Sequence, residues 1–280
     1  MKKTLAFFLG ILASGMLAAA PATYDGMAKI RNCSASIVEF AGQKDSDKVL
    51  LLTNGHCVSK DFATIDAMIN QPYSDVATVY RGNTPLIVGS LTVDKIIYAT
   101  MTNTDIAILR TNMSYGDLKQ KLRISPREIS SALPKAGDNV SAASGNLEQR
   151  YTCKVDGIAQ MVKEDKWQWI EVARLVKSEE CNILPGASGT PVVDKDGKIV
   201  AMINTGNQNG RPCTLNNPCE VDASGHTSVN KDAFYAIDIR MLNACFKNGE
   251  LDISSACSLT KPQVNFAHSL PLIDTDNHRP

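Results

Sequence analysis

Three residues of this 280-residue chain have the side chains that nucleophilic catalysis by a serine requires: His56, Asp105 and Ser188. His56 follows Leu-Thr-Asn-Gly, Asp105 precedes Ile-Ala-Ile-Leu, and Ser188 lies within Pro-Gly-Ala-Ser-Gly. Each motif alone is typical of an ordinary turn or strand end. A serine hydroxyl becomes a nucleophile only when a base accepts its proton and a carboxylate orients that base. The joint occurrence of the motifs therefore predicts a triad in which Ser188 attacks, His56 accepts the proton and Asp105 orients the imidazole.

The elements that must position these residues are short apolar runs separated by turn residues, and they form two series. Runs rich in Val, Ile and Leu with Gly, Asn or Asp between them are typical of β-strands. The first series predicts strands at 49–52, 78–80, 86–88, 95–99 and 105–109. The second series predicts strands at 139–142, 152–159, 168–174, 190–193, 199–204 and 234–238. This spacing favours two small β-barrels or a sandwich over a βαβ fold.

Two segments outside these series have a different pattern. Residues 111–137 are more polar and contain Pro126 and Pro134, so they are expected to link two domains through one helical turn. Residues 239–248 have the pattern of a helix, and Gly249 is placed to end it.

The three motifs resemble the signature motifs of the chymotrypsin/trypsin superfamily of serine endopeptidases, in the order His, Asp, Ser and at similar spacing. The resemblance implies an all-β fold of two six-stranded antiparallel β-barrels with a C-terminal helix. The first barrel is then expected at 23–125, with His56 and Asp105. The second barrel and the helix are expected at 126–257, with Ser188, followed by a loose tail at 258–280.

The resemblance also implies roles for residues around Ser188. The N–H groups of Gly186 and Ser188 are expected to form the oxyanion hole. The primary substrate pocket is expected to have Asn182 near its base and Asn204, Thr205 and Gly206 on its wall. An uncharged Asn182 does not demand a basic substrate residue, although Glu179 or Glu180 could enter the pocket through a loop shift. Ala187 stands where digestive members carry an activating aspartate, which predicts an enzyme without trypsinogen-like activation.

The eight cysteines predict disulfide bonds, because their number is even and the N-terminal signal described below indicates export to an oxidising compartment. They contain no Cys-x-x-Cys, and the histidines are not spaced as companions to them, so we expect no metal site. We expect no cofactor either. The resemblance implies a bond between Cys33 and Cys57, next to His56. The remaining expected pairs are Cys153–Cys181, Cys213–Cys219 and Cys245–Cys257. A swap between Cys181 and Cys213 or Cys219 is the main alternative.

The N-terminus has the pattern of a secretory signal peptide: Lys2 and Lys3, an apolar run at 5–17, then small residues. We expect a signal peptide at 1–22, cleaved after Ala22, and a secreted or periplasmic protein without a membrane anchor. Removing the two lysines changes 29 basic and 29 acidic residues to 27 and 29. The mature chain therefore has no excess of positive charge that would indicate binding to nucleic acid. The expected partners are protein or peptide substrates, bound by a monomer.

Two other functions compete with that of a serine endopeptidase. An α/β-hydrolase esterase requires Gly-x-Ser-x-Gly and the order Ser, Asp, His, whereas Thr190 occupies the last glycine position and the motifs here run His, Asp, Ser. A catalytically silent protease-fold binding protein stays the alternative, because folds are reused without their chemistry.

Overall fold

The computed structural model describes residues 22–59, 62, 65–254 and 256–262. Apart from Ala22, the expected signal peptide lies outside these residues, as does the tail from residue 263 onward. Within the described part of the chain, no helix is both long and apolar enough to cross a membrane.

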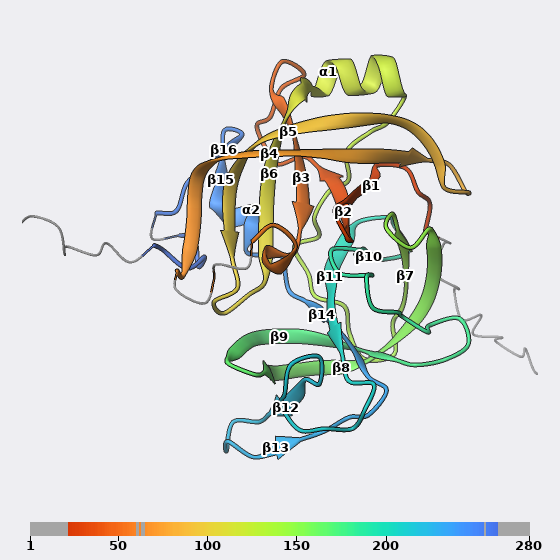
Figure 1. Ribbon diagram of the computed structural model, residues 1–280, viewed down its shortest axis with the longest axis vertical. Coiled ribbons are helices and arrows are strands. Elements are labelled where there is room, and N and C mark those ends of the chain that lie inside the picture. The colour runs from red at the N-terminus through yellow and green to blue at the C-terminus, as the bar shows by residue number, and fades with distance from the viewer. Residues whose placement is uncertain (1–21, 60–61, 63–64, 255, 263–280) are drawn as a thin grey trace, which may run out of the picture.

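The first domain is a closed barrel of six antiparallel strands in the order β1-β2-β3-β6-β5-β4. It occupies the upper part of Figure 1, where β4 and β5 run across the top. Buried aliphatic side chains from every strand fill its interior. The strands are β1 (Met27–Ile30), β2 (Cys33–Val38), β3 (Lys48–Thr53), β4 (Ala67–Arg81), β5 (Leu86–Thr100) and β6 (Ile106–Ser114).

Strand β5 corrects the expectation of two separate strands at 86–88 and 95–99. The residues between them continue the strand, because buried Leu91 and Val93 alternate with exposed Ser90 and Thr92. This period of two lets the barrel bury one face of the strand while the other stays in water.

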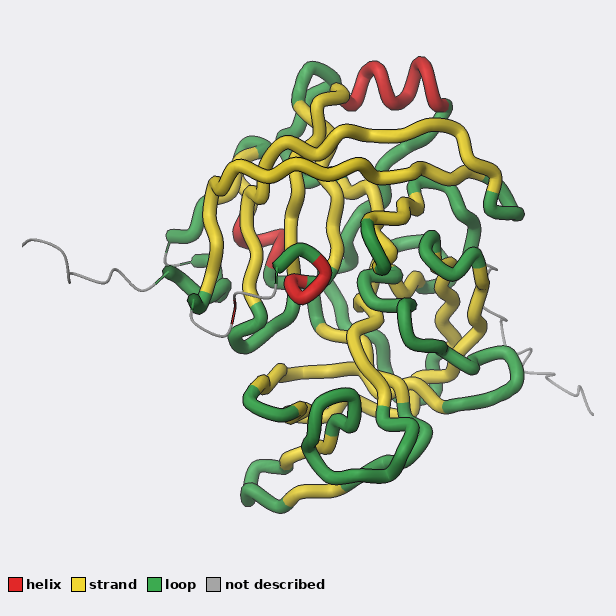
Figure 2. Tube along the Cα trace, in the orientation of Figure 1, coloured by secondary structure: helices red, strands yellow, loops and turns green. Residues whose placement is uncertain are grey.

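The second domain is an eight-stranded antiparallel sheet in the order β13-β12-β8-β7-β10-β11-β14-β9. An additional pairing of β8 with β9 joins strands β8, β7, β10, β11, β14 and β9 into a ring, and β12 and β13 extend it. The tube in Figure 2 shows this second domain as almost entirely strand and loop. Its strands are β7 (Asn139–Ser144), β8 (Gln149–Glu164), β9 (Trp167–Val176), β10 (Pro191–Val193), β11 (Ile199–Gly206), β12 (Cys219–Val221), β13 (Thr227–Ser228) and β14 (Phe234–Ile237).

The segment between the domains begins with a short helical stretch, made of α1 (Tyr115–Asp117) and the turn η3 (Leu118–Leu122). Further along, the half-buried guanidinium of Arg127 donates to the carbonyl oxygens of Thr23, Asp25 and Gly197. Because Gly197 belongs to the second domain and Thr23 precedes the first, Arg127 ties the linker to both. Burial lowers the pKa of this guanidinium, while the charge of Asp25 opposes that shift.

The helix expected at 239–248 is wrong in extent, since α2 covers only Leu242–Cys245. The chain then forms a small hairpin of β15 (Phe246–Lys247) and β16 (Glu250–Leu251). Asn248 and Gly249 have φ values of 51° and 83°, as a two-residue hairpin turn requires. The Phe246 ring stacks on Phe40 with centroids 3.8 Å apart. Phe246, which falls within the expected helix, is therefore buried as part of strand β15.

Four disulfide bonds join the cysteines in the expected pairs: Cys33–Cys57, Cys153–Cys181, Cys213–Cys219 and Cys245–Cys257. The first connects the start of β2 to the helical turn after β3.

Candidate active site

His56 and Asp105 lie in direct contact in the first barrel. His56 is in the 3-10 turn η1 (Gly55–Cys57) just after β3, and Asp105 immediately precedes β6. Nδ1 of His56 is 2.6 Å from Oδ2 of Asp105, and the backbone N–H of His56 donates to Oδ1 at 3.0 Å. Asp105 is fully buried, whereas 34% of the His56 side chain is exposed. The carboxylate therefore holds the ring by two bonds and leaves its other edge toward solvent.

Gly55 makes this close approach possible. A Cβ at this position would collide with the carbonyl oxygen of Thr100 and come within 3.0 Å of Oδ1 of Asp105. A larger residue before His56 would therefore push the turn away from the carboxylate.

Ser188 lies in the second domain, in a turn between two glycines with positive φ, 98° at Gly186 and 79° at Gly189. Its carbonyl oxygen accepts a hydrogen bond from the N–H of Ser34 in the first barrel at 2.8 Å. Its hydroxyl donates to the carbonyl oxygen of Asn204 at 3.3 Å. Because Ser34 follows Cys33, the Cys33–Cys57 bond connects the anchor of this turn to the residue after His56.

The charges around His56 raise its pKa. Burial acts in the opposite direction and is the largest single influence, but the charge and hydrogen bond of Asp105, with a further contribution from Glu164, outweigh it. The imidazole thus holds a proton to higher pH than an ordinary histidine does.

This shift predicts the pH dependence of any reaction that uses His56 as a base. Because only the neutral ring accepts a proton, kcat/KM should rise with pH through the pKa of His56, with a midpoint above the ordinary value of 6.5. A pH–rate profile measures the midpoint. Glu164→Gln is the matched variant: it removes one of the charges that raise the pKa, so its midpoint should lie lower. A wild-type midpoint at or below 6.5 would contradict the assignment.

A cleft of about 300 Å³ lies beside Ser188. Asn204, Thr205 and Gly206 line it, as does Gly186, whereas Asn182 is exposed and does not. The neighbouring Ile183 is buried and lines the cleft instead. Glu179 and Glu180 are exposed and lie outside the lining. No charged side chain of the described residues lines the cleft; its buried apolar members are Ile183, Ala187, Ile203 and Phe234.

Glu164, which sequence reasoning missed, supports the rim of the cleft from behind. This carboxylate at the end of β8 is buried and accepts hydrogen bonds from the Thr205 hydroxyl at 2.5 Å and the Asn216 N–H at 2.9 Å. Burial raises the pKa of Glu164, although the two hydrogen bonds oppose that shift. Both donors line the cleft, so Glu164 fixes β11 to the Cys213–Cys219 loop.

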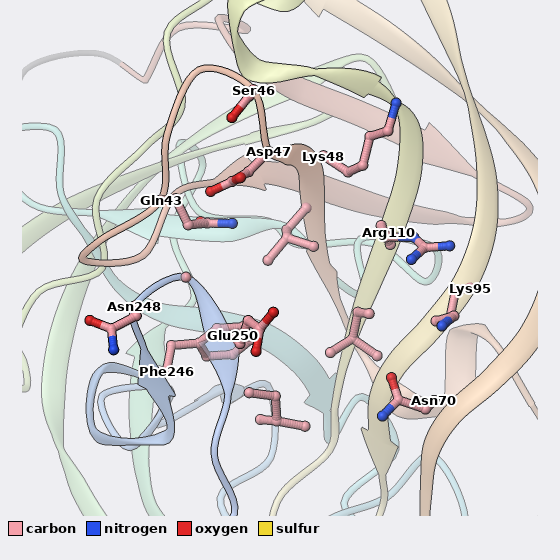
Figure 3. A pocket seen from close by; sticks show the side chains of 14 residues that line it. Gln43, Ser46, Asp47, Lys48, Asn70, Lys95, Arg110, Phe246, Asn248 and Glu250 are labelled. Carbon is pink, nitrogen blue, oxygen red and sulfur yellow. The ribbon is translucent and has the colours of Figure 1, made fainter.

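A larger cavity of about 530 Å³ lies between the first barrel and the β15–β16 hairpin. Figure 3 shows Glu250 on the hairpin, with Lys95 and Arg110 on strands of the barrel. Two of its cations have ordinary partners: Arg110 pairs with Asp94 at 2.9 Å, and Lys48 donates to the carbonyl oxygen of Asn112. None of His56, Asp105 and Ser188 lines this cavity, so its size does not mark the reactive site.

The residues His56, Cys33 and Cys57 offer potential ligand atoms within 4.8 Å of one another. Both sulfur atoms are consumed by the disulfide bond between them, so this group cannot supply thiolates to a metal ion.

Comparison with known families gives one match, in which residues 34–202 fit the model described as "Trypsin-like peptidase domain". This segment contains His56, Asp105 and Ser188. No curated protein sequence matches the chain.

Several solved structures similar to this chain are described as proteases. The MamO protease domain from Magnetospirillum magneticum, in its apo form, is 11% identical with a TM-score of 0.50 over 80% of this chain and 96% of that one. A Glu endopeptidase in complex with MPD is 14% identical, with a TM-score of 0.48 over 80% and 89%. The serine endoprotease from Yersinia pestis is 12% identical, with a TM-score of 0.46 over 80% and 62%. At such identities the MamO likeness supports the fold alone.

Proposed function

Because this chain belongs to the trypsin-like peptidase domain family, we propose that it is an exported serine endopeptidase with His56, Asp105 and Ser188 as its catalytic triad. The observation that carries the proposal is the pair of bonds from buried Asp105 to the ring and backbone of His56. Such a contact orients a histidine as a base, and the Ser188 turn is anchored on the same barrel through Ser34. Four disulfide bonds support an oxidising location, secreted or periplasmic.

In the proposed mechanism, Ser188 Oγ attacks the carbonyl carbon of the scissile bond while Nε2 of His56 takes the hydroxyl proton. The imidazolium, stabilised by Asp105, then gives that proton to the leaving amine, and an acyl-enzyme forms. Water, deprotonated by His56, releases the second product and restores Ser188. No cofactor takes part in these steps.

The N–H groups of Gly186 and Ser188 are proposed to bind the oxyanion of both tetrahedral intermediates. Among the described residues, neither group has a hydrogen-bond partner. The positive φ of Gly186, and the 3.0 Å that would separate an added Cβ from the Asn146 amide, support the need for glycine at this position. Losing one such donor typically lowers kcat by about 10²–10³.

The lining of the cleft supports a substrate class for this enzyme. The lining combines buried apolar side chains with uncharged polar ones, Asn204, Thr205, Gln208, Asn209 and Asn216. A charged substrate side chain would lose water and find no opposite charge among them. We therefore propose cleavage after uncharged residues. The catalytically silent binding protein remains the second candidate function, since the same cleft could hold a peptide without cutting it.

One experiment tests these proposals together. The disulfide-bonded protein is incubated with a mixed peptide library, with and without prior treatment by a fluorophosphonate. We expect cuts after uncharged residues, no cuts in the treated sample, and an adduct on the peptide that contains Ser188. Cuts mainly after charged residues would overturn the substrate class but keep the enzyme. Neither cuts nor an adduct would overturn the enzyme and favour the binding protein.

A further inference from the structure

Asn54 lies between β3 and the turn that carries His56, and its side chain is fully buried. Asparagine before a helical turn usually caps it by accepting a hydrogen bond from a backbone N–H of that turn. Here Asn54 makes no such capping bond. Its amide instead bonds to residues outside the helical turn.

The Asn54 amide bonds at the same time to Asp105 and to the turn that carries Ser188. Its Nδ2 donates to the carbonyl oxygen of Asp105 at 2.8 Å, and its Oδ1 accepts from the N–H of Gly189 at 2.6 Å. Gly189 directly follows Ser188, and it belongs to the second domain, whereas Asn54 and Asp105 belong to the first. One side chain, two residues before His56, therefore links Asp105 to the residue after Ser188 across the domain interface.

The surroundings leave little freedom in this link. A Cβ on Gly189 would collide with the carbonyl oxygen of Ser34 and the hydroxyl of Thr53, so only glycine lets the turn come this close. Ser34 also donates to the carbonyl oxygen of Ser188, and Thr53 donates to that of Ser34. The turn is held from both sides of Ser188, at the Ser188 carbonyl and at the Gly189 N–H, which Asn54 shares with the carbonyl oxygen of Ile203 at 3.0 Å.

We infer that Asn54 is a positioning residue for the proposed peptidase reaction, and this inference rests on that proposed function. Asn54 fixes the distance between the turn that carries Ser188 and the His56–Asp105 pair. Only a carboxamide satisfies both partners, because a carboxylate cannot donate to the Asp105 carbonyl and an alkyl group bonds to neither. Since Asn54 does not line the cleft, its loss should act on the chemical step and not on substrate binding.

The test compares steady-state cleavage of one good peptide by wild type, Asn54→Ala and Asn54→Asp, each measured on the high-pH plateau of its own profile. We expect kcat to fall about 10²-fold in Asn54→Ala, since misplacement by about 1 Å has effects of this size. KM should stay within about twofold, because an interaction that acts only on the chemical step leaves substrate binding unchanged. Asn54→Asp keeps the acceptor for Gly189 and the shape, and its kcat should fall at least about tenfold.

Asn207→Ala is the matched control. Asn207 is equally buried, and its amide bonds to the backbone of Arg211, Pro218 and Gly210 within one loop. Its loss should lower the melting temperature as much as that of Asn54 does, with kcat within about twofold of wild type.

The outcomes distinguish the proposed peptidase function from the positioning role of Asn54. Failure of the wild type to cut any peptide would refute the proposed function itself. If the wild type cuts, unchanged kcat in a folded Asn54 variant overturns the positioning role, and so does an equal fall of kcat in Asn207→Ala. Should Asn54→Ala fail to fold, Asn54→Asp alone decides: a folded Asp variant with wild-type kcat refutes the inference, and one with a reduced kcat at unchanged KM supports it.

Discussion

The Ser188→Ala variant is expected to lose peptide cleavage almost entirely, with kcat lower by about 10⁶-fold. The change removes one oxygen atom from a half-buried side chain that donates a 3.3 Å hydrogen bond to the Asn204 carbonyl oxygen, so the protein should still fold. Without that oxygen no acyl-enzyme forms. Initial rates on a peptide cut by the wild type, together with a melting curve, measure both effects.

Ser46→Ala is the control for this experiment. Ser46 is an exposed serine that lines the larger cavity next to the β15–β16 hairpin. Its substitution should leave kcat and KM unchanged. Cleavage that persists in Ser188→Ala but disappears in Ser46→Ala would move the reactive site to that cavity.

Asp105→Asn is expected to lower kcat by about 10⁴-fold while the protein stays folded. Asp105 accepts one bond from the His56 N–H and a second at Nδ1, and both require oxygen acceptors. An asparagine has one oxygen. If its NH₂ faces Nδ1, the ring carries its proton on Nε2 and cannot accept the proton of Ser188. If its NH₂ faces the backbone N–H, two donors oppose each other.

The pH profile gives Asp105→Asn a second readout. Loss of the negative charge should also lower the pKa of His56, because Asp105 is the largest influence that raises it. Asp94→Asn is the matched control, since this partly exposed aspartate pairs with Arg110 on the barrel surface. A kcat within tenfold of wild type in folded Asp105→Asn would exclude the proposed role of this carboxylate.

The sequence predicted the elements of the site where the signals are local. His56 and Asp105 flank strands whose apolar residues mark their bounds, and the glycines around Ser188 mark a turn that needs positive φ. The Cys33–Cys57 pair followed from a resemblance, whereas the other pairs were expected with a swap at Cys181 left open; the structure has the expected pairs.

The parts that could not be predicted depend on contacts between distant segments. Asn54 bonds to residues 51 and 135 positions away, and neither partner leaves a trace beside it in the chain. Glu164 likewise bonds to Thr205, 41 positions away. Ile183, rather than Asn182, lines the cleft. The segment before Ser188 is irregular, so no sequence period assigns its side chains to the inside or the outside.

The C-terminal helix illustrates a different limit. A glycine after an apolar run ends a helix or turns a hairpin, and Asn248 beside Gly249 is compatible with both. The choice depends on Phe40, which lies far away in the sequence and stacks on Phe246.

The Cys33–Cys57 bond also has a consequence for the cell that makes this protein. Closing a chain segment of 24 residues, it contributes about 3 kcal/mol in the loop-entropy model. In reducing cytosol the two thiols stay unjoined, although the pairing of β2 with β3 still holds Ser34 near the strand that precedes His56. If the chain is the exported peptidase proposed above, this bond forms only after translocation, so newly made chains in the cytosol lack one of the links between the Ser188 turn and the His56 turn.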